Sequence, residues 1–328
     1  MKKTFFIAAV AAISSLVSCE EQNADSGIKM QTDSDDKVRL CVNVVQPDTK
    51  SSASLPGSAI GKLEVMVFDE DGTLEDYQSK SGSSLGELSC TKGTKTVVAV
   101  VNSKTSLSSI ANFDDLKKIK SDLADNEASY CVMEGMQQID VTDSQTLNLT
   151  VSRKVAKVQV ENITLNFALD HQKTSTVKAE ALYLINVPGD MAFFSDAAPS
   201  KWYNKLAAET KSLPIIYDNL SQKELKEGSP ITSVYSYYTY PNPYTTDTSD
   251  PVWSERPTRL VLELSINSKI YYYPVTLPKF ESNHLYRISL TVTRPGSSSP
   301  DIPVDKYVVA PKIQVEPWNE GEPINQVI

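Results

Sequence analysis

The sequence has few of the residues that metal and redox chemistry need. It contains two histidines, His171 and His284, which cannot make a three-histidine metal site. Three of the four cysteines, Cys41, Cys90 and Cys131, lack CxxC spacing and fit neither a zinc site nor a complete disulfide framework, although a single disulfide stays open. We therefore expect no metal and no cofactor.

Positive charge is also scarce. The formal net charge is -9, and no basic patch interrupts the acidic balance. A chain of this charge repels phosphate groups, because it has no cluster of cations to neutralise them. The composition argues against nucleic acid and anionic lipid headgroups as partners.

The apolar run near the N-terminus is too short to span a membrane. Residues 5–17 make up a run of 13, against the roughly 20 that a transmembrane helix needs. Two lysines precede this run and small residues follow, so residues 1–18 are predicted to be a cleaved signal peptide. Residues 16–19, LVSC, resemble a bacterial lipobox, which predicts lipidation, such as palmitate, at Cys19; ordinary cleavage beside a chance cysteine is the alternative.

The rest of the chain has the pattern of a mostly β protein. Residues 19–36 are polar and acidic and predict a lipidated flexible tether. Beyond them, short runs rich in Val, Ile, Thr and Tyr alternate with Gly, Pro, Asn and Asp. We predict two β-sandwich domains in tandem, residues 37–152 and 153–328, which meet near Arg153.

Three segments make the strand prediction specific. Residues 62–77 are typical of a hairpin with its turn at Asp71-Gly72. Residues 94–102, TKTVVAVVN, form a continuous apolar run that indicates a buried strand. Residues 147–165 are predicted to form one long strand.

A single short helix is expected in the N-terminal domain, at residues 112–123. Asn112 can cap its first turn, and Leu116, Ile119 and Leu123 would share one face. No other segment predicts a helix of comparable strength.

Two segments, one toward each end of the chain, have apolar residues at every second position. In the first strand, residues 37–46, four apolar side chains would point to one face: Val38, Leu40, Val42 and Val44. In the C-terminal segment, residues 306–318, four more fall on one parity: Tyr307, Val309, Ile313 and Val315. Because Pro311 cannot donate to a ladder, we expect two short pairing stretches with a break between them. An ordinary first strand of a sandwich would show the same alternation.

An ordered set of segments behind the lipobox resembles the fimbrillin family, the type V pilins of Bacteroidales. The segments are VMVFDEDG, VVAVVN, SRKVAKVQVENITL, YTYPNP, KIYYYPVTLP, NHLYRISLTVTRPGSSSPDIPV and KIQVEPW. The likeness runs from Cys19 to Trp318. It implies that both sandwich domains are transthyretin-like.

The resemblance also implies a route of assembly. A lipoprotein precursor is cut after its first strand, that strand leaves with its lipid, and the open groove accepts the C-terminal strand of another subunit. Here the loop at residues 47–58, PDTKSSASLPGS, offers the bond between Lys50 and Ser51. Well-known family members carry Arg where this chain has Lys50, and Arg39 lies inside the first strand. The protease would therefore have to accept lysine.

We expect a structural subunit of a fimbria at the outer membrane and cell surface that supports adhesion or colonisation and is not an enzyme. Its partners would be further copies of itself, anchor and tip subunits, the outer membrane through the lipid on Cys19, and a host or bacterial receptor. An uncut chain would instead be a lipid-retaining anchor or accessory subunit.

Two other classes compete with this interpretation. A monomeric surface lipoprotein could bind glycans through a group of tyrosines: Tyr235, Tyr237, Tyr238, Tyr240 and Tyr271 to Tyr273. An enzyme could use Ser84, because residues 82–86 match the nucleophile elbow G-x-S-x-G. That elbow needs a helix after the serine, and a strand is predicted there, so no catalytic residue is expected.

Overall fold

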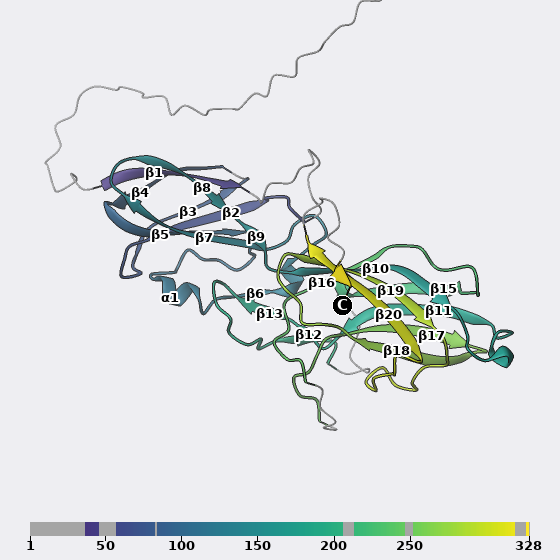
Figure 1. The fold of residues 1–328 in the computed structure, drawn as a ribbon. Helices are drawn as coiled ribbons and strands as arrows, with labels where there is room; N and C mark the ends of the chain where they lie inside the picture. The colour runs from purple at the N-terminus through teal and green to yellow at the C-terminus, as the bar shows by residue number, and fades with distance from the viewer. Residues whose placement is uncertain are drawn as a thin grey trace, which may run out of the picture. The chain divides into compact units, whose positions relative to one another are not determined.

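Almost all of the regular structure is β-strand (Figure 1). The computed structural model describes residues 37–45, 57–82, 84–205, 213–246, 252–318 and 326–327. Within these ranges no helix is long and apolar enough to cross a bilayer. The prediction of a mostly β fold with one short helix is confirmed.

The first pair of sheets encloses the N-terminal core. A three-stranded sheet has the order β4-β1-β8, with β1 (Lys37–Val45), β4 (Ser84–Thr91) and β8 (Gln145–Thr150). A five-stranded sheet has the order β3-β2-β5-β7-β9, with β2 (Lys62–Phe68), β3 (Leu74–Ser81), β5 (Gly93–Val101), β7 (Met133–Val141) and β9 (Ser152–Arg153). Apolar side chains from both sheets form one buried cluster between them.

The second pair of sheets encloses the larger core. One sheet has the order β16-β10-β19-β20-β21, with β10 (Ala156–Leu165), β16 (Tyr235–Thr239), β19 (His284–Val292), β20 (Val309–Pro317) and β21 (Gln326–Val327). The other has the order β15-β11-β17-β18, with β11 (Val177–Ile185), β15 (Tyr217–Glu224), β17 (Arg259–Ile266) and β18 (Lys269–Thr276). Their cluster also includes Leu123 and Cys131 from the N-terminal part, and the domain boundary at residue 153 stays a prediction.

The predicted buried strand and the predicted hairpin both form. β5 covers the run TKTVVAVV, and β2 and β3 form a hairpin in which Gly72 has φ +86°. A left-handed turn residue of this kind favours glycine, because a Cβ would crowd the backbone. β2 and β5 are buried on both faces because a second cluster, which includes Phe68 and Leu116, packs outside their sheet. Burial on both faces explains why β5 is continuously apolar.

The predicted helix is much shorter than its sequence pattern. α1 spans only Phe113–Leu116, and the amide of Asp115 donates to the Asn112 side chain at 2.8 Å, so the predicted cap is present. The chain then enters β6 (Lys120–Asp122) and a 3-10 turn at Leu123–Asp125. β6 pairs with β13 (Asp190–Ala192), so pairing with a distant strand replaces the last turns of the helix.

The prediction of one long strand over residues 147–165 was wrong. The segment is divided into β8, β9 and β10, which belong to three different sheets. β8 and β10 each keep their own apolar alternation, so the pattern did not reveal the bends between them. Further short elements are β12 (Val187–Pro188), β14 (Trp202–Tyr203) and 3-10 turns at Asp170–Gln172 and Pro214–Ile216.

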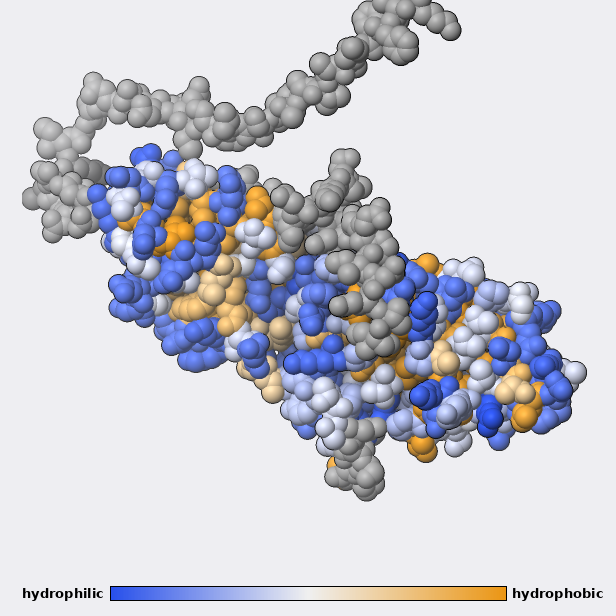
Figure 2. Space-filling model, viewed as in Figure 1, coloured by the Kyte–Doolittle hydropathy of each residue, from blue (hydrophilic) through white to orange (hydrophobic). Residues whose placement is uncertain are grey.

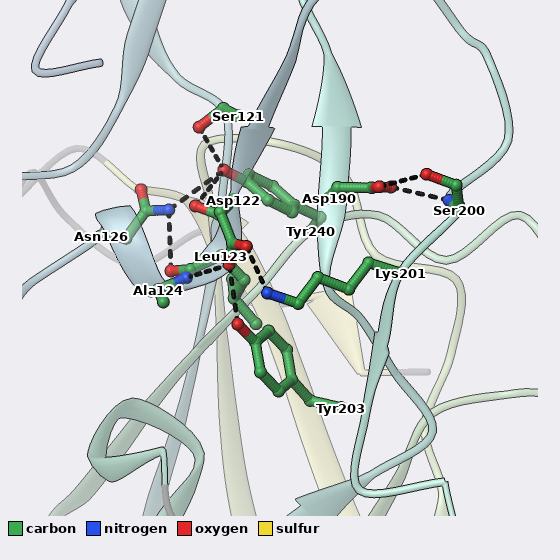
Figure 3. A network of polar contacts seen from close by, with 10 residues as sticks. All are labelled: Ser121, Asp122, Leu123, Ala124, Asn126, Asp190, Ser200, Lys201, Tyr203 and Tyr240. Carbon is green, nitrogen blue, oxygen red and sulfur yellow. Dashed lines mark hydrogen bonds and ion pairs between the residues drawn. The ribbon is translucent and has the colours of Figure 1, made fainter. Parts of the chain in front are cut away.

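A polar network ties β6 to strands that lie far away in the sequence (Figure 3). The Asp122 carboxylate accepts hydrogen bonds from the Tyr203 hydroxyl and the Ala124 amide, at 2.8 and 2.9 Å, and pairs with Lys201. The buried Tyr240 hydroxyl lies 2.8 Å from the Ser121 hydroxyl and donates to the Asp122 carbonyl at 3.2 Å. Partial burial alone would raise the pKa of Asp122, but the hydrogen bonds and Lys201 outweigh it and lower this pKa.

We predict that Asp122→Asn destabilises the fold in a pH-dependent way. The folded-state pKa of Asp122 lies below its unfolded value of about 3.9, so its stabilising effect is present above that pH and is lost as the pH falls through the folded pKa. The variant should lower the free energy of unfolding by about 1–2 kcal/mol at neutral pH. In urea titrations the deficit should shrink at about pH 3.

The exposed Asp143 provides the control for this substitution. Asp143→Asn should leave the free energy of unfolding within about 0.5 kcal/mol of the parent at either pH. An Asp122→Asn deficit that is equally large at both pH values would contradict the role given to the charge.

Candidate functional site

The first strand lies in the middle of its sheet. β1 pairs antiparallel with β4 and parallel with β8, so neighbouring strands cover both of its edges (Figure 1). The ladder with β4 covers Lys37 to Cys41 and then Asn43, whereas the ladder with β8 covers Leu40 to Val45. Removing β1 would therefore leave a gap one strand wide between two unpaired edges.

The inward side chains of β1 close the N-terminal core. Leu40, Val42 and Val44 are buried, and Val38 is half-buried against the same cluster. Their neighbours on the flanking strands are apolar as well: Leu88 and Cys90 on β4, and Leu147 and Leu149 on β8. Three fully buried aliphatic side chains contribute roughly 5–9 kcal/mol, so the interior depends on this strand.

The side-chain polar contacts of β1 are few and exposed. Arg39 pairs with Glu87 at 3.4 Å, and the Asn43 amide donates to the Asn148 side chain at 3.3 Å. Exposed contacts of this kind contribute little, about 0–1 kcal/mol each. β1 is therefore held by its two ladders and its apolar face, and any strand with the same alternation could supply both.

The segments on either side of β1 hold the other predicted sites. Cys19, Lys50 and Ser51 lie outside the described residues, as do residues 1–36 and 46–56. Lipidation at Cys19 and cleavage after Lys50 stay predictions. The described chain resumes at Gly57.

The C-terminal segment is part of its own sheet. β20 pairs with β19 along its whole length, and Val309 and Ile313 are buried in the larger core. Val315 is half-buried, and Tyr307 precedes the strand with 69% of its surface exposed. On the side away from β19, the pairs that the described residues show are those of Gln314 and Val315 with β21.

The predicted break at Pro311 was wrong. Pro311 lies opposite Leu290 within an uninterrupted ladder. The Thr293 amide donates to the Val308 carbonyl at 3.0 Å, and hydrogen-bonded pairs alternate along an antiparallel ladder. Pro311 therefore falls at a position whose nitrogen points away from β19, where its missing N–H removes no bond from this ladder.

The end of β20 is fixed by a site that the sequence did not reveal. Trp318 is buried, with the Arg153 guanidinium 4.3 Å from its ring centroid and the ring of Tyr238 at 5.7 Å. Arg153 also donates to the Trp318 carbonyl at 3.2 Å. One residue before the end of the strand, Glu316 accepts from Arg287 at 2.7 Å. The sequence signal for this site was an aromatic residue, Trp318, after an alternating segment. Its partners, Arg153 and Tyr238, could be identified only from the fold.

Part of the chain, including β1 and its two neighbours, matches a known protein family. A family model described as "Major fimbrial subunit protein (FimA)" matches residues 37–178, the range that includes β1, β4 and β8. Over this range the chain is similar to the fimbrillin family. No curated protein sequence matches the chain.

Solved structures extend the likeness to both pairs of sheets. A fimbrilin (fimA) from Porphyromonas gingivalis matches with a TM-score of 0.61 and 18% identity, over 88% of this chain and 99% of that one. A candidate cell adhesion protein from Bacteroides eggerthii matches with a TM-score of 0.66 and 17% identity, over 86% and 96%. The tip fimbrial protein Mfa3 from Porphyromonas gingivalis, with a C-terminal truncation, matches with a TM-score of 0.53 and 14% identity, over 86% and 100%. At these identities the likeness shows a shared fold.

The three cysteines in the described part of the chain are not joined by disulfides. Cys90 is buried on β4, where it pairs with Val38 of β1, whereas Cys41 lies half-exposed on the outer face of β1. Burial raises the pKa of Cys90, and it raises the pKa of Cys131 to about 12. No disulfide therefore ties β1 to its neighbours in the described part of the chain.

Most of the residues considered for other functions have structural positions in the fold. Of the candidate glycan-binding tyrosines, four are buried and unable to stack on a sugar: Tyr237, Tyr238, Tyr240 and Tyr273. Ser84 begins β4, so a strand follows it and the nucleophile elbow does not form. The described ranges contain no group of three or more His, Cys, Asp or Glu side chains that could hold a metal.

We predict that Leu40→Ala strongly destabilises the uncut chain. The side chain is fully buried between the two N-terminal sheets, so its loss leaves a cavity and should lower the free energy of unfolding by about 2–5 kcal/mol. Arg39→Ala, one residue earlier on the outer face, should change it by no more than about 0.5 kcal/mol. Urea unfolding measures both. Equal, small effects would show that β1 does not close the core.

Proposed function

We propose that this chain is the shaft subunit of a fimbria, exported as a lipoprotein and polymerised by strand exchange after cleavage behind Lys50. The observation that carries the proposal is the position of β1. The first strand of the fold, between a predicted lipid anchor and a predicted cleavage loop, is also the central strand of its sheet. A central strand at a chain end can be exchanged for an equivalent strand, because it contributes a ladder to each neighbour and one apolar face.

Cleavage sets the timing in this proposal. While β1 is covalently attached, its effective concentration in its own groove is high, and a strand from another molecule competes poorly. After a cut in the loop, β1 remains linked only to the lipidated segment and can leave with it. The cut molecule then presents the two edges of β4 and β8 with the apolar side chains beneath them.

The C-terminal segment, residues 306–318, is the proposed donor. Val309, Ile313 and Val315 would take inward positions in the groove, with Tyr307 at its entrance. β20 makes one long ladder, with β19, and only two residue pairs with β21. It can leave by breaking one long ladder, and the exchange moves it from near a sheet edge to the centre of another sheet. Trp318 and Glu316 must also leave Arg153 and Arg287.

Two other functions remain as alternatives. A chain that keeps its loop intact would stay lipid-anchored through Cys19 and serve as an anchor or accessory subunit. A monomeric glycan-binding lipoprotein would have to use half-buried tyrosines such as Tyr235 and Tyr271, because most of the cluster is buried.

The first test is the mass of intact chains recovered from the cell surface. A chain that starts at Ser51 without lipid supports the shaft subunit. A chain that starts at lipidated Cys19 in all of the protein overturns it and leaves the anchor subunit or the glycan-binding lipoprotein. Lys50→Gln is the matched variant, since it should block the cut and keep the protein monomeric.

We predict that Cys90 reports the occupation of the groove. With β1 in place its thiol is 1% exposed, so a maleimide should label it slowly. After loop cleavage and loss of β1, labelling should rise by at least about tenfold, and it should fall again when a donor strand fills the groove. Unchanged labelling in a chain shown to start at Ser51 would mean that β1 stays in place.

Cys131 is the internal control for this labelling, because it is fully buried at a position away from β1, near Arg153. Its labelling should stay slow before cleavage and after the loss of β1, the two states in which Trp318 still packs in the same core as Cys131. A rise at both thiols would indicate general unfolding rather than an open groove. Peptide mass spectrometry separates the two sites.

A further inference from the structure

The two ladders of β1 cover different halves of the strand. From Lys37 to Cys41, β1 pairs in regular register with β4, and its register with β4 then shifts before Asn43. β4 cannot follow β1 much further, because the chain turns back into β3 at Gly82, where φ is +92°. From Leu40 to Val45 the regular ladder is the one with β8.

The two ends of β1 are therefore held unequally. The end at Val45 relies on a parallel ladder, which is slightly less stable per residue than an antiparallel one. Burial does not add to this difference, because the inward Val38 is half-buried and the inward Val44 is 8% exposed. Lys37 and Val38 keep regular antiparallel partners at Thr91 and Cys90.

The predicted cut lies beyond the weaker end. Cleavage after Lys50 would free the chain that follows Val45, whereas the chain before Lys37 would stay attached to the tether and its lipid. A strand that is anchored at one end and newly free at the other separates from the free end.

We infer that strand exchange begins at the Val44 end of the groove. β1 peels from Val45 toward Lys37, and the C-terminal segment of a second copy first occupies the position that Val44 vacates beside Leu149 of β8. This inference rests on the proposed function and adds to it a direction and an entry point. The Cys90 end of the groove is the last to change strands.

Hydrogen exchange of the full chain tests the direction without requiring a polymer. Before cleavage, and more strongly after it, the amides of residues 42–45 should exchange at least about tenfold faster than those of residues 38–41. Uniform protection along β1, or faster exchange at the Lys37 end, would overturn the inference. A clear gradient in a cut chain that never polymerises would support the direction and count against the shaft-subunit function.

Matched valine substitutions test the entry point. The probe is a synthetic peptide of residues 306–318, added to cut protein while the release of β1 is followed by mass spectrometry. Val44→Ala should speed the displacement by about tenfold, because a loss of about 1.4 kcal/mol of contact at the entry site corresponds to a tenfold change. Val38→Ala, at the far end, should change the rate by less than about threefold. Equal acceleration by both variants, or a larger effect of Val38→Ala, would overturn the inference.

A control separates the rate of exchange from general loss of stability. Val141→Ala removes the same atoms from β7, in the same cluster but on the opposite sheet. Its effect on the displacement rate should be no larger than that of Val38→Ala. If Val141→Ala accelerates displacement as much as Val44→Ala, the entry-point assignment is wrong.

Discussion

The N-terminal sandwich depends on its first strand, β1. β1 joins β4 to β8, and without it the three-stranded sheet would be two separated strands above an open core. The loss of a strand at a sheet edge removes one ladder, because only one neighbour pairs with it. Here the loss would remove two ladders and the apolar face of Leu40, Val42 and Val44. The loss of β1 would therefore open the core of the N-terminal sandwich.

The contacts that hold β1 and those that hold β20 differ in kind. β1 has a few exposed polar contacts, so its binding depends on backbone pairing and alternation, which many sequences could provide. β20 has, in addition, specific side-chain contacts at its end: Trp318 against Arg153, and Glu316 with Arg287. In the proposed exchange, departure of Trp318 would let the Arg153 guanidinium regain water, which would offset part of the lost contact. A pocket lined only by apolar side chains would not have that compensation.

On the face drawn in Figure 2, hydrophobic residues lie in separate patches bordered by hydrophilic ones. Within the N-terminal sandwich, β1 covers the apolar side chains of the buried cluster. Loss of β1 would expose these side chains. The proposed assembly therefore requires that they stay covered until a replacement strand is near.

The sequence by itself determined the fold class, the hairpin at Asp71-Gly72, the cap at Asn112 and the inward alternation of β1. Each of these follows from residues that are neighbours in the chain, so periodicity and turn chemistry suffice to predict them. Only the tertiary structure decided that residues 147–165 bend into three strands and that α1 stops after Leu116. It also decided that β1 lies between β4 and β8 and that Pro311 faces away from β19. These features depend on partners that lie many residues away, and a local pattern holds no information about which edge of a strand will be covered.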